Sequence, residues 1–306
     1  MAGGTRFAHT LGPVRGAAYE LQQRASSAVL RRRRREAFAD VEAFLLFIGY
    51  PRSGHSIVGA CVNAHRDAVV SHELGAQRLV VEGCSRDVLY SRILARASWF
   101  NLRGNRTNYA YSVAGEWQGR FETLRVIGDK RGGAVTRCIA ERPDFLDRVR
   151  SLVEVPLRLL HVVRNPFDNI AAISIWHELP VEAAADYYFR HCDTTARLAS
   201  LCEPSEVLTV RHEQLIRRPE HVLAEVCGFL GLERYAGYVE NCAAVVFESP
   251  TYTRRRVAWP GALVREIEER IERTPVLRGY GFATPRHDAP QPRPVRSGGR
   301  DRPPDG

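Results

Sequence analysis

The segment YPRSGHS, residues 50–56, places a basic side chain, two hydroxyls and a glycine in one short loop. It follows the apolar run Phe44–Ile48 and precedes a stretch with a helical pattern. Backbone N–H groups of such a loop, together with the positive end of the helix, favour an anion such as a phosphate. Arg52 would add a formal charge, and Ser53 and Ser56 would add hydrogen-bond donors. Taken alone, the segment is interpreted equally well as a structural turn.

A second basic residue, Arg164, stands at the end of another apolar run, in LLHVVRNPFDNIAAIS. Pro166 suits the first turn of a helix, where its missing N–H costs nothing. An arginine at the carboxyl end of a strand can hold a phosphate through two parallel hydrogen bonds. An ion pair with Asp168 is the structural alternative. Two basic strand ends in one sheet favour a ligand that carries two phosphate groups.

The basic residues are almost all arginine. Of the 44 lysine and arginine residues, 43 are arginine and only Lys130 is lysine. A position that stays lysine can require a compact ammonium group that a planar guanidinium does not imitate. Composition alone favours the other interpretation, the chance survival of one surface lysine.

Elements that would position these residues alternate between short apolar strands and helical stretches. Alternation of this kind predicts an α/β fold of three layers, with a parallel sheet and a P-loop-like strand-loop-helix. Ligands of such folds bind at the carboxyl ends of the strands. The predicted strands cover residues 44–48, 69–70, 125–128, 158–163 and 206–210, and the clearest helices cover 55–64, 166–174, 219–230 and about 235–246.

Length and composition limit the class of protein. A chain of 306 residues with 44% hydrophobic residues can bury one large core, which we place at residues 41–284. Residues 1–40 form a basic arm, and residues 285–306 form a Pro- and Arg-rich tail expected to be disordered. The run Arg31–Arg35 is interpreted as a solvated arm rather than a membrane contact, and no nucleic-acid partner is expected.

Compartment follows from two further patterns. No apolar run reaches the ~18–20 residues of a membrane span, and the start of the chain has no signal-peptide pattern. The seven cysteines are scattered and include no CxxC pair. They are typical of reduced thiols rather than of disulfides or a zinc site, so we expect a cytoplasmic protein.

Three of these segments resemble the PAPS-dependent sulfotransferases. YPRSGHS is similar to their 5′-phosphosulfate loop, RNPFDNIAAIS resembles their 3′-phosphate motif, and Leu208–Leu232 resembles the strand and helix that follow. Similarity runs from about Phe44 to Tyr280. It implies an enzyme that moves a sulfuryl group from PAPS to an acceptor hydroxyl or amine and releases PAP.

The resemblance also implies a set of donor-binding residues. Ala172 stands where the family usually has a serine, eight residues after the arginine of the 3′-phosphate motif, which leaves Ser174 as the candidate. His212 stands where a tyrosine near the adenine is common. The remaining expected donor contacts are Arg52, Ser53, Gly54, His55 and Ser56 for the 5′-phosphosulfate, and Arg164, Arg254, Arg255 and Arg256 for the 3′-phosphate.

Catalytic residues are implied by similarity to the tyrosylprotein branch of that family. In NAHRDAVVSHE, Glu73 matches the position of the catalytic base, and His72 is the alternative base. Either side chain could instead cap the following helix. In VIGDKRGG, Lys130 matches an active-site lysine, and with Arg52 it would stabilise charge on the leaving group. A sulfuryl group carries less negative charge than a phosphoryl group, so no metal is expected.

Two other functions would use a similar anion-binding loop. A P-loop nucleotide kinase would need GxxxxGK[ST], which the loop lacks. A non-catalytic PAPS- or PAP-binding scaffold would need the two arginines but neither Glu73 nor Lys130. The acceptor is expected to be a small molecule, glycan, lipid or peptide. Aromatic residues of the stretch Gly83–Arg120 would cover the acceptor or pack internally: Tyr90, Trp99, Phe100, Tyr109, Tyr111 and Trp117.

Overall fold

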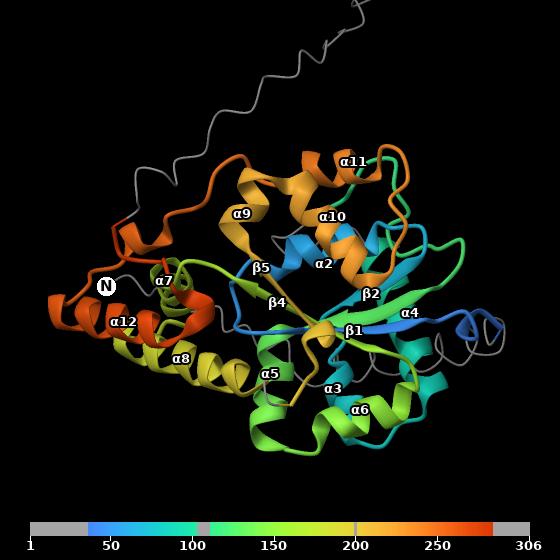
Figure 1. Cartoon of the computed structure of the whole chain (residues 1–306), viewed down its shortest axis with the longest axis horizontal. Coiled ribbons are helices and arrows are strands. Elements are labelled where there is room, and N and C mark those ends of the chain that lie inside the picture. The colour runs from blue at the N-terminus through green and yellow to red at the C-terminus, as the bar shows by residue number, and fades with distance from the viewer. Residues whose placement is uncertain (1–35, 103–110, 199–200, 284–306) are drawn as a thin grey trace, which may run out of the picture.

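Five parallel strands form the central sheet of the computed structural model, which describes residues 36–102, 111–198 and 201–283 (Figure 1). Their spatial order is β2-β3-β1-β4-β5. β1 lies in the middle, with β2 and β3 on one side and β4 and β5 on the other, so the direction in which the chain crosses the sheet reverses next to β1. Open parallel sheets bind ligands at such a reversal. The strands are β1 (Ala43–Ile48), β2 (Ala68–His72), β3 (Val126–Lys130), β4 (Leu157–Val163) and β5 (Val207–Arg211).

The central strand β1 is buried along its whole length. Leu45 and Phe47 face one hydrophobic cluster, whereas Phe44, Leu46 and Ile48 face another, as the alternation of side chains along a strand requires. A continuous apolar run is thus the sequence signature of a parallel strand covered on both faces. This explains why the apolar runs predicted the sheet.

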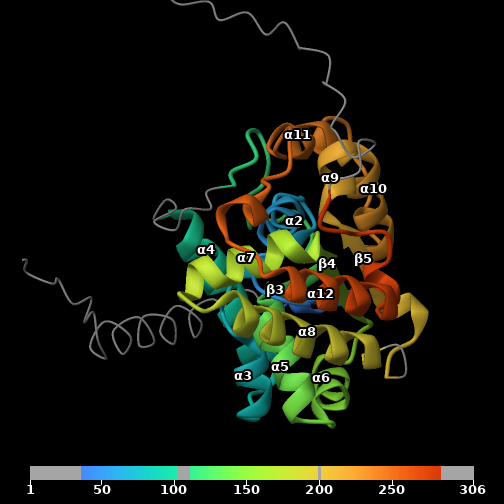
Figure 2. The same ribbon diagram turned by 90° about the vertical axis from the view of Figure 1, so that its left-hand side faces the viewer.

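Helices cover both faces of the sheet and give three layers (Figures 1 and 2). One face carries α2, α10 and α11, which share a core with β1. The other face carries α3, α4, α5 and α6. The bounds are α2 His55–Asn63, α3 Ala76–Val81, α4 Arg86–Leu102, α5 Gly132–Glu141, α6 Phe145–Val153, α9 His212–Arg217, α10 Pro219–Leu230 and α11 Tyr238–Ala244.

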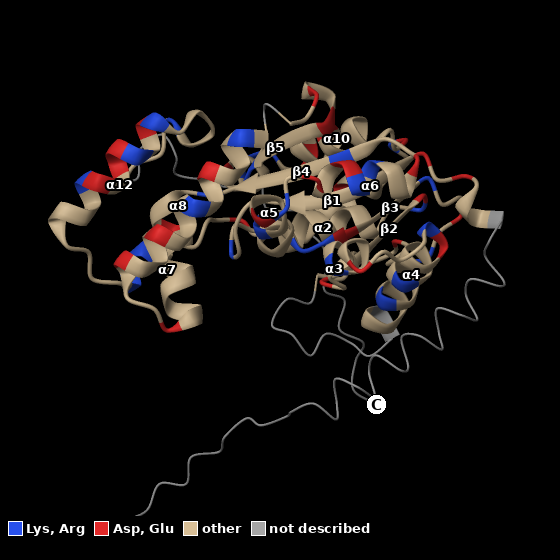
Figure 3. Ribbon diagram, turned by 90° about the horizontal axis from the view of Figure 1, so that it is seen from below, with Lys and Arg blue, Asp and Glu red and all other residues tan. Residues whose placement is uncertain are grey.

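A third group of helices, α7 (Pro166–His177), α8 (Val181–Arg197) and α12 (Gly261–Arg273), has its own core beyond the end of β4. Basic and acidic residues alternate along the outer side of α12, while its apolar residues face that core (Figure 3). Short 3-10 turns complete the chain: η1 Glu36–Phe38, η3 Pro204–Glu206, η4 Thr253–Arg256 and η5 Pro275–Leu277.

The predicted α/β class and parallel sheet are confirmed. All five predicted strands exist, and each begins and ends within two residues of its predicted bounds. The helices α3 to α6, α8, α9 and α12 were not predicted, since tertiary packing stabilises them as much as their own pattern does. No helix in the described ranges has the length and apolar character that a membrane crossing requires. Arg31–Arg35, the tail and Tyr109 lie outside the described residues.

Candidate active site

A cavity of about 1110 Å³ lies at the carboxyl edge of the sheet. Four residues that line it directly follow a strand: Glu73 after β2, Arg131 after β3, Arg164 after β4 and His212 after β5. The loop after β1 supplies the next wall of the cavity. Eight residues predicted from the sequence line this one space: Arg52, Gly54, His55, Ser56, Glu73, Arg164, His212 and Arg256.

The loop between β1 and α2 is bent tightly around the cavity. Arg52 has φ +69° and Gly54 has φ +96°, and a positive φ is unusual and costly for a residue such as arginine. Glycine is required at position 54 for a second reason, because a Cβ there would run into the ring of His212. The sequence alone left a structural turn open, and the cavity lining now makes a ligand-binding loop the better interpretation.

Two loop residues predicted to contact the same ligand lie differently. Ser53 is fully buried and does not line the cavity, and its Oγ lies 3.1 Å from Nδ1 of His55. Burial, followed by the charge of Lys130, lowers the pKa of His55 to about 3, so its ring is neutral at pH 7. Ser53 therefore supports the loop from beneath while His55 presents a neutral ring to the cavity.

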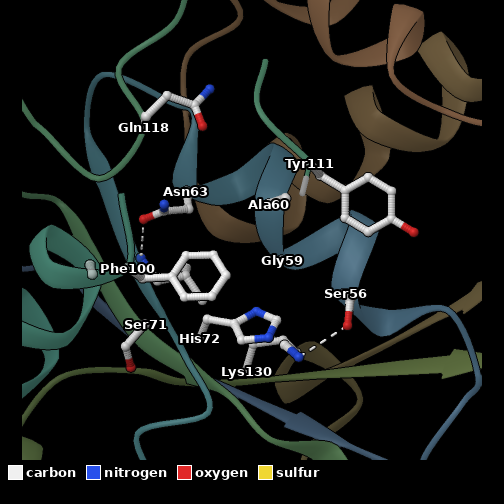
Figure 4. A pocket seen from close by; sticks show the side chains of 12 residues that line it. Ser56, Gly59, Ala60, Asn63, Ser71, His72, Phe100, Tyr111, Gln118 and Lys130 are labelled. Atoms are coloured by element: carbon white, nitrogen blue, oxygen red, sulfur yellow. Dashed lines mark hydrogen bonds between the residues drawn. The ribbon is translucent and has the colours of Figure 1, made fainter. Parts of the chain in front are cut away.

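Lys130 joins this loop to the end of β2. Its Nζ donates to Ser56 Oγ and to Glu73 Oε1, each at 3.0 Å, and the first contact is visible in Figure 4. The close approach depends on Gly59 of α2, where a Cβ would lie 2.8 Å from Cγ of Lys130. The only lysine of the chain is thus a buried residue of the site.

Electrostatics keep both members of the Lys130–Glu73 pair charged. Burial lowers the pKa of Lys130, and the carboxylate of Glu73 opposes this effect. Burial would by itself raise the pKa of Glu73, but the charge and hydrogen bond of Lys130 outweigh it, and the net shift is downward. Glu73 is therefore a carboxylate at neutral pH.

His72 also lines the cavity, beside Glu73. Its ring stacks on Phe100 with centroids 4.4 Å apart, next to a smaller cavity that reaches Tyr111 and Lys130 (Figure 4). Burial, then Lys130, lowers the pKa of His72 to about 4. Both predicted candidates for the base are present, and both are unprotonated at pH 7.

Arg164 and His212, which follow β4 and β5, form another part of the cavity wall. Nη2 of Arg164 donates to the carbonyl of Thr251 and, at 3.1 Å, to Thr253 Oγ1. Nε of Arg164 and Nδ1 of His212 are buried and have no hydrogen-bond partner among the described residues. Both residues line the cavity, and unsatisfied polar atoms in residues of a cavity wall favour a polar ligand.

The ion pair proposed between Arg164 and Asp168 does not form. Asp168 instead accepts two bonds from the guanidinium of Arg254, at 3.1 and 2.7 Å, and a third from its N–H. The remaining N–H groups of Arg254 donate to the carbonyls of Gly281 and Phe282. Each nitrogen of its guanidinium donates inside the protein and Arg254 does not line the cavity, so the structure does not bring it there as the sequence predicted.

Two further predicted contacts also point elsewhere. Arg255 lies over the ring of Tyr252 at 4.9 Å and does not line the cavity, so only Arg256 of this triplet does. Ser174 donates to the carbonyl of Leu179 at 2.6 Å, while Ala172 lines the cavity. Ser174 therefore does not line the cavity, and its hydroxyl has a partner in the following turn.

The aromatic residues of 83–120 divide between packing and the site. Tyr90 is buried against Phe38 and Phe44. Trp117 lies against Arg120. Among the described aromatic residues of this stretch, Phe100 and Tyr111 line the two cavities of the site.

Sequence analysis missed several residues of the cavity. The guanidinium of Arg52 lies 4.6 Å from the ring centroid of Trp176, which is 57% exposed. Its neighbour Ile175 and the distant Phe247 also line the cavity and were not predicted. Arg131 and Arg137 were missed as well, although the position of Arg131 after a strand matches that of Arg164. No group of three His, Cys, Asp or Glu side chains in the described part of the chain is arranged to hold a metal ion.

Comparison with known proteins gives the class of this chain. Residues 45–236 match the model of the sulfotransferase family, which is more than half of the chain, so the chain belongs to that family. Sulfotransferase STF9 from Mycobacterium avium superimposes with a TM-score of 0.51 at 11% identity, over 90% of this chain and 89% of that one. This likeness shows the common fold.

Two other solved structures are more distant. The sulfotransferase domain of an olefin synthase from Synechococcus PCC 7002 has a TM-score of 0.42 at 17% identity, over 73% of this chain and 83% of that one. Mouse sulfotransferase SULT7A1, solved with PAP, has a TM-score of 0.41 at 12% identity, over 78% and 84% of the two chains. No curated protein sequence matches the chain significantly.

Proposed function

We propose that this sulfotransferase moves a sulfuryl group from PAPS to an acceptor hydroxyl or amine and releases PAP. One observation carries the proposal: Lys130 binds both Ser56 of the anion-binding loop and Glu73 at the end of β2, each at 3.0 Å. A cation between a phosphate-type loop and a carboxylate is placed where a transferred anionic group and its acceptor would meet.

Arg164, Arg256 and His212 would bind the other end of the donor. Arg164 and His212 each offer a buried nitrogen without a partner among the described residues, and Arg256 lines the same cavity. A guanidinium beside a phosphate forms strong, directional hydrogen bonds. Arg52 and Ser56 would hold the 5′-phosphosulfate at the loop.

The reaction is an in-line displacement at sulfur. Glu73 takes the proton of the acceptor as its oxygen or nitrogen bonds to sulfur, a contribution of roughly 10²–10⁴ in rate. The bond from sulfur to the bridging oxygen breaks, and the electron pair leaves with the nucleotide. Lys130 and Arg52 stabilise the charge that develops on that phosphate. A sulfuryl group needs no metal clamp of the kind used in phosphoryl transfer.

A PAPS- or PAP-binding scaffold without activity is the second candidate. It would retain the arginines of the donor walls but would not need the Lys130–Glu73 pair, whose burial carries a desolvation cost.

A cytoplasmic location fits the seven cysteines, which are all free thiols. His72 stays the alternative base, because its ring lies at the same wall.

Incubation of the purified chain with labelled PAPS and a panel of phenols, alcohols, sugars and amines tests the proposal. We expect conversion of PAPS to PAP that depends on an acceptor and on Glu73. Tight PAP binding without turnover for any acceptor would favour the scaffold. Failure to bind PAP would overturn both.

A further inference from the structure

The charges around the cavity exceed what the proposed donor can neutralise. Glu73 is the one acidic residue among the described residues that line it. PAPS brings about four negative charges, two on its 3′-phosphate and two on its phosphosulfate. Arg164 and Arg256 would face the first group, and Arg52 with Lys130 would face the second. The cations at the cavity are Arg52, Lys130, Arg131, Arg137, Arg164 and Arg256.

Glu73 and the donor together neutralise about five of these six charges, and Arg131 and Arg137 are the two cations to which no donor group is assigned. Arg131 lies near the turn that carries Glu73, and Arg137 lies on α5. Nη1 of Arg131 is 2.9 Å from the position that a Cβ on Gly75 would take, two residues beyond Glu73. Arg131 forms no ion pair with another described residue. Arg137 has only an exposed contact of 4.0 Å with Glu141, which contributes little.

Large apolar side chains also border the cavity. Ile175, Trp176 and Phe247 are 40%, 57% and 54% exposed, and all three line it. Exposed aromatic side chains around a cavity are typical of a site that covers the apolar part of a ligand. The cavity thus combines two cations that have no buried counter-ion among the described residues with an apolar rim.

We infer that the acceptor is itself an anion: a molecule whose accepting hydroxyl or amine lies on an apolar or aromatic body that also carries a carboxylate or phosphate. The inference rests on the proposed function. The carboxylate or phosphate pairs with Arg131 and Arg137, and this pairing orients the accepting atom toward Glu73. A neutral acceptor would leave Arg131 without a counter-ion among the described residues and Arg137 with only its exposed contact to Glu141.

Three phenols of similar size test this inference: 4-hydroxyphenylacetate, the neutral alcohol tyrosol, and the cation tyramine. Their binding to the protein saturated with PAP is measured by calorimetry, which requires no turnover. We expect 4-hydroxyphenylacetate to bind at least roughly tenfold more tightly than the other two, as hydrogen bonds to charged groups allow. The double variant Arg131→Gln/Arg137→Gln should lose this preference and keep its affinity for PAP.

Arg265→Gln/Arg273→Gln is the matched control, because it removes the same charge from α12, away from the cavity. It should keep the preference. Equal binding of the three phenols, absence of binding, or a preference that survives in the Arg131/Arg137 variant would overturn the inference. Loss of PAP binding by the unmodified chain would instead overturn the proposed function, so the two failures are distinguishable.

A different observation concerns Asp129, which was not predicted to be part of the site. Its carboxylate is fully buried and accepts four hydrogen bonds. One comes from Ser71 Oγ at 2.8 Å, and three come from the N–H groups of residues 74–76 at 2.9–3.0 Å. All four donors flank Glu73, so Asp129 closes the turn that carries the proposed base.

That turn is strained at the residue that matters. Glu73 has φ +55°, a conformation that persists only when its surroundings enforce it. Asp129 and Lys130 are consecutive on β3, and their side chains leave the strand on opposite sides. One holds the backbone after Glu73, while the other holds the Glu73 carboxylate.

We propose Asp129 as the positioning residue of Glu73, a role that also depends on the proposed function. Asp129→Asn keeps the shape but replaces one accepting oxygen by a donor. Amide hydrogen exchange of residues 74–76 should accelerate by about tenfold or more. The kcat should fall while the KM for PAPS stays unchanged, a split that a general loss of stability would not produce.

Ser71→Ala is the milder companion variant, since it removes one of the four bonds and leaves the carboxylate in place. It should show the same changes to a smaller extent. If Asp129→Asn folds with unchanged exchange at residues 74–76, or if its kcat is that of the unmodified chain, the role is wrong. If it does not fold, unchanged exchange and kcat in Ser71→Ala would lead to the same conclusion.

Discussion

Lys130 and Glu73 form an ion pair in which only the lysine is hidden. Nζ and Oε1 are 3.0 Å apart, yet the side chain of Lys130 is 2% exposed and that of Glu73 is 49% exposed. The backbone repeats the contact, because the N–H of Glu73 donates to the carbonyl of Lys130 at 3.3 Å. The ammonium is thus fixed from behind, and the carboxylate remains open to the cavity, as a proton acceptor must be.

Glu73→Gln should abolish most turnover. The amide keeps the shape but cannot take the acceptor proton, so we expect the rate to fall by roughly 10²–10⁴. PAP affinity, measured by calorimetry, should stay close to that of the unmodified chain. His72→Ala is the control, and a dead His72→Ala beside a fully active Glu73→Gln would identify the histidine as the base.

Lys130→Arg should lower turnover by about tenfold or more, equal to ~1.4 kcal/mol of barrier, although it conserves charge. The ammonium of Lys130 contacts Ser56 and Glu73 at 3.0 Å each, and the broader planar guanidinium would crowd both partners. PAPS affinity should change much less than the rate. A wild-type rate for Lys130→Arg would remove the lysine from the mechanism.

Arg164→Ala should weaken PAP and PAPS to a similar extent, because both carry the 3′-phosphate. A nucleotide without that phosphate should bind almost as before. Loss of a charge-assisted bidentate contact predicts a decrease of roughly tenfold or more, measured by calorimetry. Equal weakening for both kinds of nucleotide would place Arg164 elsewhere on the donor.

Arg254 and Arg256 should separate stability from binding. Arg254→Ala leaves the buried carboxylate of Asp168 without its partner, so the free energy of unfolding should fall by ~3–5 kcal/mol. Arg256→Ala should leave stability unchanged and weaken PAP. Urea denaturation and calorimetry of both variants check this, and a stable Arg254→Ala that binds PAP poorly would reverse the two roles.

Acidification below pH 6.5 should destabilise the fold before the carboxylates titrate. Burial lowers the pKa of His55 and His212 to about 3 and that of His72 and His161 to about 4. The unfolded chain, with histidine pKa values of ~6.5, binds protons in this window that the folded chain does not, so stability falls as pH falls.

Urea denaturation at pH 7 and pH 5 measures this effect. The free energy of unfolding should drop, with uptake of roughly four protons on unfolding near pH 5. His161→Gln should reduce the drop by about one quarter. A stability that is constant between pH 7 and 5 would contradict the neutral state assigned to these rings.

The sequence by itself determined the sheet and the two turns that face the donor. Phe44–Ile48 is apolar without interruption because both faces of β1 are covered, and a turn must follow where the run ends. Arg52 and Arg164 each stand just beyond such an end, so parallel strands bring them to one edge. Local signals of this kind need no knowledge of the rest of the fold.

Tertiary structure decided which neighbours of these residues reach the cavity. Arg254, Arg255 and Arg256 are indistinguishable in sequence, but a buried Asp168 captures the first, Tyr252 lies under the second, and only the third faces the cavity. The role of Asp129 likewise depends on N–H groups from a loop 53–55 positions earlier in the chain. A polar side chain turns toward whichever partner satisfies it, and such partners come from segments distant in sequence, which no local pattern records.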